Sequence, residues 1–127
     1  MKLLLDTNIF IVSILAPEEL SPQLAALLLD ASVERSVSVV SLWEIAVKVQ
    51  IGKLDLPLEE SFYRRHLQAL QARVLPVEMS HSLALFQVPQ IHKDPFDRLL
   101  VAQARSEGMI IATRDAILAR YPVETIY

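Results

Sequence analysis

An α/β fold, in which helices flank a mostly parallel sheet within one domain, is predicted by three features of this 127-residue sequence. Short apolar or β-branched segments alternate with longer helical ones, which is the pattern of parallel α/β proteins. The first such segment, residues 3–5, is Leu-Leu-Leu, and it is apolar on both sides of an extended chain, as an interior strand requires. A hydrophobic fraction of 53% with only two glycines excludes disordered and collagen-like chains.

In the first half of the chain, the strand at 3–5 leads into a short apolar helix at 9–15. Ser21 followed by proline then predicts a cap for a helix that reaches residue 30. The β-branched residues 36–40 predict the second strand. Ser41 and Glu44 have the spacing of a capping box and predict a helix over 41–51, which Gly52 would end.

The second half repeats this alternation. A helix is expected at 58–72, and a strand at 74–77 contains Pro76, which favours an edge position. Ser80 predicts the cap of a helix over 80–88. Asp94 and the proline after it predict the start of a helix that ends near Glu107, before Gly108. The remaining expected elements are a strand at 109–112, a short helix ending near residue 121 and a last strand at 123–126.

Charge and composition narrow the possible functions. The net charge of −3 excludes a nucleic-acid binder that works through bulk positive charge, so any such binding needs a local basic patch or a metal ion. With no cysteine, neither a disulfide nor a thiolate site can form, which suits a reducing cytoplasm. The apolar run at 9–16 is too short to span a bilayer. We therefore expect a soluble, cytoplasmic protein that does not enter membranes.

Four acidic residues occupy comparable places at or near strand ends: Asp6, Glu44, Asp97 and Asp115. Parallel strands bring their carboxyl ends to one edge, where open α/β sheets bind ligands. Asp6, Glu44 and Asp115 are thereby expected at this edge, and Asp97 joins them if its helix begins there. On that helix, Asp97 lies above an apolar face, so its side chain is expected to point inward.

Each acid also has a structural interpretation. Asp6, Asp94 and Asp115 could be helix caps, and Glu44 could complete a capping box and pair with Lys48 one turn later. Several carboxylates in one cleft, by contrast, share protons or hold a cation. Oxygen ligands favour Mg²⁺ or Mn²⁺. The histidines, which are His66, His81 and His92, lack the spacing of metal ligands and are expected to be surface or core residues.

Four stretches in this order carry a family resemblance: residues 4–8 (Leu-Leu-Asp-Thr-Asn), 41–48 (Ser-Leu-Trp-Glu-Ile-Ala-Val-Lys) with Gly-Lys-Leu at 52–54, 94–104 (Asp-Pro-Phe-Asp-Arg-Leu-Leu-Val-Ala-Gln-Ala) and 113–115 (Thr-Arg-Asp). Together they resemble PIN-domain proteins, and specifically VapC-type toxin ribonucleases, over residues 1–127. The resemblance implies a five-stranded parallel sheet, a Mg²⁺-dependent (or Mn²⁺-dependent) endoribonuclease, an antitoxin partner of the VapB type and a homodimer.

By motif match, the catalytic and metal-binding acids of this family correspond to Asp6, Glu44, Asp97 and Asp115. Thr113 would support them with a hydroxyl at the same site, and Asp94 would remain a cap or an outer acid. Because the chain is acidic, contacts to RNA phosphates must come from local cations near this edge. The candidates are Lys48, Lys53, Lys93, Arg98 and Arg114.

Other functions remain open from the sequence. A phosphatase with a nucleophilic aspartate after the first strand usually has an acid two residues later, and here that residue is Asn8. A receiver-like signalling domain would place paired acids near the first strand, where only Asp6 stands. A non-catalytic interaction module, in which every acid is a cap, is the third possibility.

Overall fold

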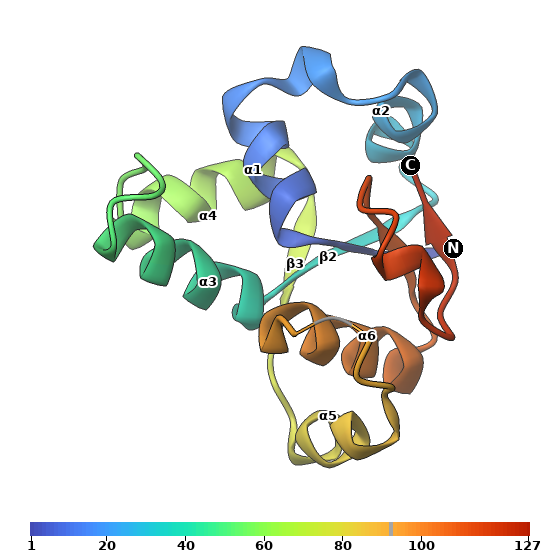
Figure 1. Cartoon of the computed structure of the whole chain (residues 1–127). Helices are drawn as coiled ribbons and strands as arrows, with labels where there is room; N and C mark the ends of the chain where they lie inside the picture. Colours follow the sequence, from blue (N-terminus) through green and yellow to red (C-terminus); the bar gives the residue numbers. More distant parts are fainter. Residues whose placement is uncertain (92) are drawn as a thin grey trace.

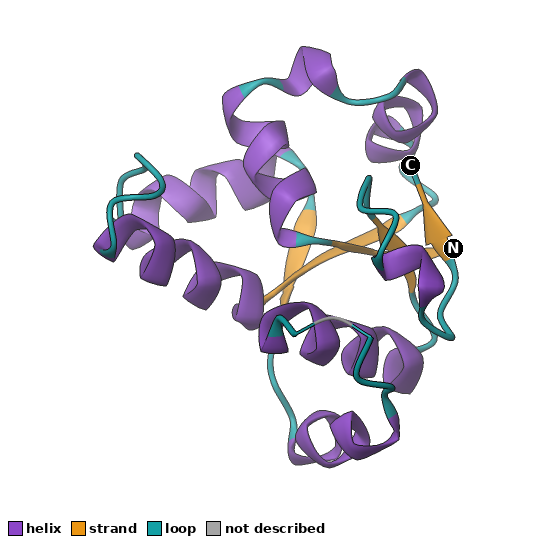
Figure 2. Cartoon of the chain, in the orientation of Figure 1, coloured by secondary structure: helices purple, strands orange, loops and turns teal. Residues whose placement is uncertain are grey.

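A computed structural model describes residues 1–91 and 93–127. Its centre is a five-stranded, fully parallel sheet with the order β3-β2-β1-β4-β5 (Figures 1 and 2). The strands are β1 (Lys2–Leu5), β2 (Glu34–Ser38), β3 (Ala72–Leu75), β4 (Ile110–Ala112) and β5 (Thr125–Ile126). The predicted α/β class and parallel sheet are confirmed, and β3, the strand followed by Pro76, lies at an edge of the sheet as expected.

Helices connect the strands, as parallel pairing requires. The α-helices are α1 (Thr7–Leu15), α2 (Pro22–Leu29), α3 (Val39–Gln50), α4 (Glu60–Ala69), α5 (Met79–Ala84) and α6 (Pro95–Glu107). Short 3₁₀ turns occupy Pro17–Glu19, Leu85–Gln87 and Leu118–Arg120. No helix in the described part of the chain is long and apolar enough to cross a membrane.

The three leucines of β1 divide the core into two layers. Leu3 and Leu5 pack in one apolar cluster with α1, α2 and α4, whereas Leu4 packs in a second cluster with α6 and β4. All three side chains are fully buried. Successive strand residues point to opposite faces, so a triple leucine fits only a strand that is covered on both sides. In Figure 1, α1, α2 and α4 lie on one side of the sheet and α5 and α6 on the other.

The start of α3 differs from the prediction. The strand β2 ends at Ser38, and the helix begins at Val39 rather than Ser41. The Ser38 hydroxyl caps the helix by accepting a hydrogen bond from the Val40 N–H at 3.0 Å. Ser41 therefore lies inside the helix, where its hydroxyl accepts from the Thr7 hydroxyl at 2.9 Å. The predicted capping box was wrong, because Ser38 is an equally good cap three residues earlier.

The α5 region also differs. Its helix begins at Met79 rather than at a residue capped by Ser80, and it changes to a 3₁₀ turn at Leu85. The imidazole of His81 accepts a hydrogen bond from the Glu78 backbone N–H through Nδ1 at 2.9 Å. A side chain three residues into the helix thus satisfies the cap backbone. By contrast, α6 has the predicted boundaries, with Asp94 as its cap and Gly108 at φ 66° after its last turn.

The register fixes where the site residues begin. Leu5 of β1 is aligned with Val37 of β2 and with Ala112 of β4. Asp6, Ser38 and Thr113 follow these aligned residues directly, and the Asp6 N–H donates to the Ala112 carbonyl at 3.0 Å. The carboxyl ends of the three central strands therefore bring polar residues to one edge of the sheet.

Candidate active site

One cleft at this edge collects the predicted acids. It has a volume of about 320 Å³, enough for a hydrated ion and a phosphate group. All four predicted acids line it, although they come from four separate parts of the chain. Its lining residues are Asp6, Thr7, Asn8, Glu44, Lys48, Asp94, Asp97, Arg114 and Asp115.

Asp6 is both a helix cap and a cleft residue. Its carboxylate accepts a hydrogen bond from the Ile9 N–H at 2.7 Å, which caps α1. Burial raises the pKa of Asp6 above its ordinary value, and the nearby charges of Asp115 and Glu44 raise it further. Hydrogen bonds from the Thr113 hydroxyl and the Ile9 N–H act in the opposite direction. Capping and a place in the cleft are therefore compatible.

Glu44 lies in the second turn of α3 with its side chain almost fully buried. One carboxylate oxygen, Oε2, forms an ion pair with Lys48 Nζ at 2.8 Å. The other, Oε1, is buried and has no hydrogen-bond partner among the described residues. A buried anionic oxygen without a donor is costly, so its presence at a cleft indicates a group that binds there.

Asp97 has the most strongly perturbed acidity of the cleft. Its pKa is raised to about 7, first by burial and then by the charges of Asp94, Glu44, Asp6 and Asp115. The predicted inward orientation is consistent with this surrounding ring of carboxylates. An acid near neutrality in a cleft is typical of functional sites.

Thr113 joins two of the acids. Its hydroxyl donates to the carboxylate of Asp6 and accepts from the Asp115 N–H at 3.0 Å. Asp115 in turn accepts from the Ile117 N–H at 2.9 Å through Oδ1, an arrangement that holds the turn after β4. The sequence placed Thr113 beside the site, and the structure brings its hydroxyl into contact with this acidic edge.

The predicted cations separate into two groups. Lys48 and Arg114 line the cleft, and Arg114 Nε donates to the Asn8 side chain at 2.8 Å. Arg98 lines a different pocket with Leu85 and Phe86, and neither Lys53 nor Lys93 is among the residues that line the acidic cleft. The sequence could not make this distinction, because it depends on which side of a helix or loop each cation leaves.

The fit of a divalent cation can be judged from the donors present. Within residues 1–91 and 93–127, no group of three or more His, Cys, Asp or Glu side chains is arranged so that it could hold a metal ion. However, Mg²⁺ commonly binds through one or two carboxylates and keeps several waters. An all-oxygen donor set, the unpartnered Glu44 Oε1 and mutually repelling carboxylates fit such an open site.

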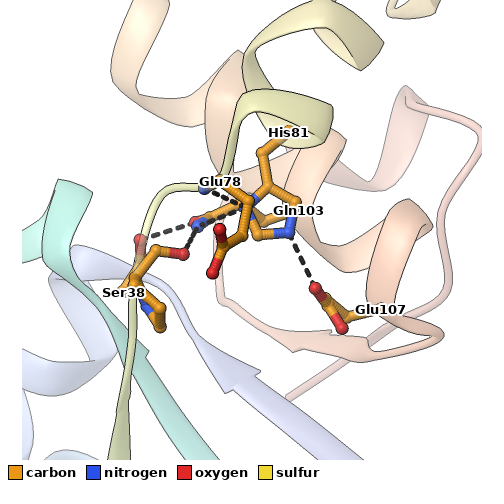
Figure 3. Close-up of polar contacts among 6 residues, drawn as sticks. Ser38, Glu78, His81, Gln103 and Glu107 are labelled. Atoms are coloured by element: carbon orange, nitrogen blue, oxygen red, sulfur yellow. Dashed lines mark hydrogen bonds and ion pairs between the residues drawn. The ribbon is translucent and has the colours of Figure 1, made fainter.

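A buried polar network lies behind the cleft and links the helices that carry Glu44 and Asp97 (Figure 3). The Ser38 hydroxyl donates to Gln103 Oε1 at 2.5 Å, and Gln103 Nε2 donates to the Pro76 carbonyl at 3.1 Å. His81 Nδ1 accepts from the Glu78 N–H, so its proton lies on Nε2, which contacts Glu107 Oε1 at 2.8 Å. His81 is thus a buried structural residue, as expected; His92 lies outside the described residues.

Two residues that line the cleft, Thr7 and Asn8, were not predicted from the sequence as site residues. Thr7 and Asn8 follow Asp6 in the first turn of α1, and Thr7 also bonds to Ser41 beneath the cleft. Asp94, which was expected from the sequence to be a cap or an outer acid, caps α6 by accepting a hydrogen bond from the Phe96 N–H at 2.9 Å and also lines the cleft. The position of Thr7 and Asn8 directly after Asp6 could have predicted them, since polar residues in the first turn of a helix at this edge face the ligand.

Comparison with solved structures shows the same fold at low identity. VapBC2 from Rickettsia felis, bound to a DNA fragment of its promoter, matches with a TM-score of 0.72 at 16% identity and covers 99% of this chain and 98% of its own. DNA-bound VapBC from Salmonella typhimurium matches with a TM-score of 0.70 at 19% identity, and the match covers 99% of this chain and 97% of that chain. FitAcB from Neisseria gonorrhoeae matches with a TM-score of 0.60 at 19% identity, and the match covers 98% of this chain and 96% of that chain.

No curated protein matches the sequence significantly. The family model of the PIN domain, however, matches residues 3–124, which is nearly the whole chain. This match includes each of the four acids in the cleft, the strands β2, β3 and β4, and β1 apart from its first residue, and it ends directly before β5. The chain therefore belongs to the PIN domain family.

Proposed function

We propose that this protein is a metal-dependent endoribonuclease that hydrolyses RNA phosphodiester bonds and serves as the VapC-type toxin of a toxin–antitoxin pair. PIN domains are generally nucleases, and the matched structures are described as VapBC and FitAB complexes. The observation that carries the proposal is the cleft in which Asp6, Glu44, Asp97 and Asp115 meet Lys48 and Arg114.

Asp6 and Asp97 are the residues that would chiefly hold a Mg²⁺ or Mn²⁺ ion, with Glu44 and Asp115 beside them. When bound, such an ion activates water and neutralises charge that develops at phosphorus. The protein supplies the carboxylates and their supports. Asp97, with a pKa of about 7, releases its proton when a cation is held, and the Thr113 hydroxyl keeps the Asp6 carboxylate in place.

Lys48 and Arg114 would orient the substrate. Both line the cleft, and a phosphate between them would be attracted by their charge. Lys48 also pairs with Glu44, so its side chain is positioned before substrate arrives. Arg114 is held in a similar way by its bond to Asn8. The phosphatase alternative is not favoured, because Asn8 occupies the position of the second acid and already serves as this acceptor.

The test is a Mg²⁺ titration with purified protein and a labelled RNA. We expect cleavage that requires Mg²⁺ or Mn²⁺ and stops in EDTA. Cleavage that persists in excess EDTA would contradict the metal requirement. Covalent phosphorylation of an aspartate without RNA turnover would support a phosphatase or receiver instead. The absence of both activities would support an interaction module.

The partner can be tested separately. We propose that an antitoxin of the VapB type covers the cleft and that the toxin forms a homodimer. Co-expression with the product of an adjacent small reading frame should yield a complex in which RNA cleavage is suppressed. The mass of the isolated protein in solution reports the homodimer.

A further inference from the structure

An exposed tryptophan stands beside the acidic cleft. Trp43 is the only tryptophan of the chain, and 59% of its surface is accessible. It directly precedes Glu44 on α3, and its ring contacts that of Phe96, which directly precedes Asp97 on α6. The elements α3 and α6 begin side by side at this edge (Figure 1). The aromatic pair therefore spans the boundary between the two helices that carry these acids.

The geometry of the pair leaves the indole available. The ring centroids of Trp43 and Phe96 are 4.9 Å apart with an interplanar angle of 75°, which is an edge-to-face contact. Such a contact restrains the ring and covers at most one indole face. Val39, one turn earlier on the same side of α3, is also exposed. A restrained aromatic face open to solvent matches the platforms on which nucleic-acid bases stack.

The charge of the cleft explains why such a platform would be needed. Asp6, Glu44, Asp94, Asp97 and Asp115 line the cleft together with the cations Lys48 and Arg114, and the whole chain carries −3. Phosphate attraction alone is therefore weak, particularly before a metal is bound. Base stacking on an aromatic ring does not depend on charge, so it provides binding that the acids do not oppose.

We propose that Trp43, supported by Phe96, binds substrate by stacking an unpaired base next to the phosphate in the cleft. Bases inside a duplex have no free face, so a duplex cannot use this platform. This inference rests on the proposed nuclease function and adds a substrate-binding residue outside the acidic cleft. It assigns Trp43 a role in substrate binding rather than in the chemical step.

The experiment uses the fluorescence of Trp43, which is free of other tryptophan signals. The protein is titrated with a single-stranded oligoadenylate and with a blunt duplex of equal length, both in EDTA, which prevents the proposed metal-dependent cleavage. We expect the single strand to quench the fluorescence in a saturable manner and the duplex to leave it nearly unchanged. Equal quenching by both, or none by either, would overturn the proposal.

Variants separate stacking from structure. Trp43→Ala should raise the Kd for the single strand, measured by anisotropy of a labelled oligonucleotide, about 5- to 150-fold. Trp43→Phe should recover most of the affinity because it restores an aromatic face. Phe86→Ala is the matched control, since Phe86 is an almost fully exposed aromatic that lies outside the cleft, and its Kd should equal that of the wild type. A wild-type Kd for Trp43→Ala would refute stacking.

Three further outcomes are distinguishable. If Trp43 fluorescence changes with protein concentration and not with RNA, the surface pairs with a second copy and the inference fails. Cleavage of RNA by wild-type protein, with an unchanged KM for Trp43→Ala, would overturn the inference but leave the nuclease function intact. Quenching by the single strand without any Mg²⁺-dependent turnover would overturn the nuclease function and leave single-strand binding by Trp43 intact.

Discussion

At the scale of single residues, side chains that cap helices also line the acidic cleft. Asp6 caps α1 through one carboxylate oxygen and also lines the cleft, and Asp94 does the same for α6. The reason is that the helices following parallel strands begin at the carboxyl edge, where their N–H groups favour negative charge. The sequence left capping and metal binding as alternatives for Asp6, and the structure shows that the carboxylate that caps α1 also lines the cleft.

Asp97→Asn separates charge from capping. At pH 8 the substitution removes a carboxylate that burial and neighbouring acids disfavour, so the metal-free protein should become more stable. A change of one in pKa corresponds to about 1.4 kcal/mol, but solvent screening at this partly exposed side chain and a lost helix-dipole contribution of about 0.3–1 kcal/mol reduce the gain. We expect a rise of about 1–2 kcal/mol in the free energy of unfolding, measured by urea denaturation, and a loss of Mg²⁺ affinity and RNA cleavage.

Asp94→Asn is the control for this substitution. Asparagine caps helices about as well as aspartate, so cleavage should survive this substitution. Wild-type cleavage by Asp97→Asn at saturating metal would remove Asp97 from the site and weaken the nuclease proposal.

The raised pKa values of Asp97 and Asp6 also predict a dependence of stability on pH. The pKa of Asp97 is about 7 in the folded protein and near 3.8 in the unfolded chain, so between these values the folded state binds a proton that the unfolded state lacks. Stability therefore falls as pH rises through this window. The melting temperature of metal-free protein should be higher at pH 5.5 than at pH 8, and the difference should shrink in Asp97→Asn.

Metal binding should show the opposite trend. A cation requires the deprotonated carboxylate, so Mg²⁺ affinity should weaken as pH falls below about 7. Isothermal titration at pH 6 and pH 8 checks this. An affinity that is independent of pH would show that Asp97 does not change its protonation when the metal binds.

At the scale of elements, sequence patterns located most helices and strands but missed several boundaries. The α6 helix was predicted within a residue, because Asp94-Pro95 and Gly108 are strong start and stop signals. By contrast, Val39 and Val40 were assigned to a strand for their β-branched side chains, yet they form the first turn of α3. Local propensity could not show that the Ser38 hydroxyl caps this turn and bonds to Gln103, 65 residues away.

This long-range bond makes Gln103 a test of how α3 and α6 are held together. Gln103→Leu keeps the side-chain volume but leaves the proton of the buried Ser38 hydroxyl without its acceptor and removes the donor to the Pro76 carbonyl. An unsatisfied buried group costs about 1–3 kcal/mol, so we expect the free energy of unfolding to fall by about 1–3 kcal/mol. Ser106→Ala, at an exposed position on the same helix, should change it by less than about 0.5 kcal/mol. An unchanged stability for Gln103→Leu would show that the network contributes little.

At the scale of the whole molecule, strand order explains why four scattered acids could be predicted to converge. With β1 between β2 and β4, the residues after these strands meet at one edge, and α6 begins there as well. The sequence alone did not fix the start of α6 at this edge. The sequence also could not show which of the five candidate cations line the cleft, because a flexible basic side chain leaves no periodic signal. Of these five, only Lys48 and Arg114 do so.

The small number of cations in the cleft predicts how RNA binding responds to salt. The chain carries −3 overall, so attraction to RNA must come from the cations in the cleft, and Lys48 is partly neutralised by Glu44. Each phosphate contact contributes about −0.7 to the slope of log K against log salt for a single strand. We expect a total slope of about −1 to −2, measured by fluorescence anisotropy with an uncleavable oligonucleotide. Arg114→Ala should reduce the slope by about 0.7, whereas Arg105→Ala, at the far end of α6, should not. A slope near zero, or equal effects of the two substitutions, would show that the cleft cations do not contact the RNA backbone.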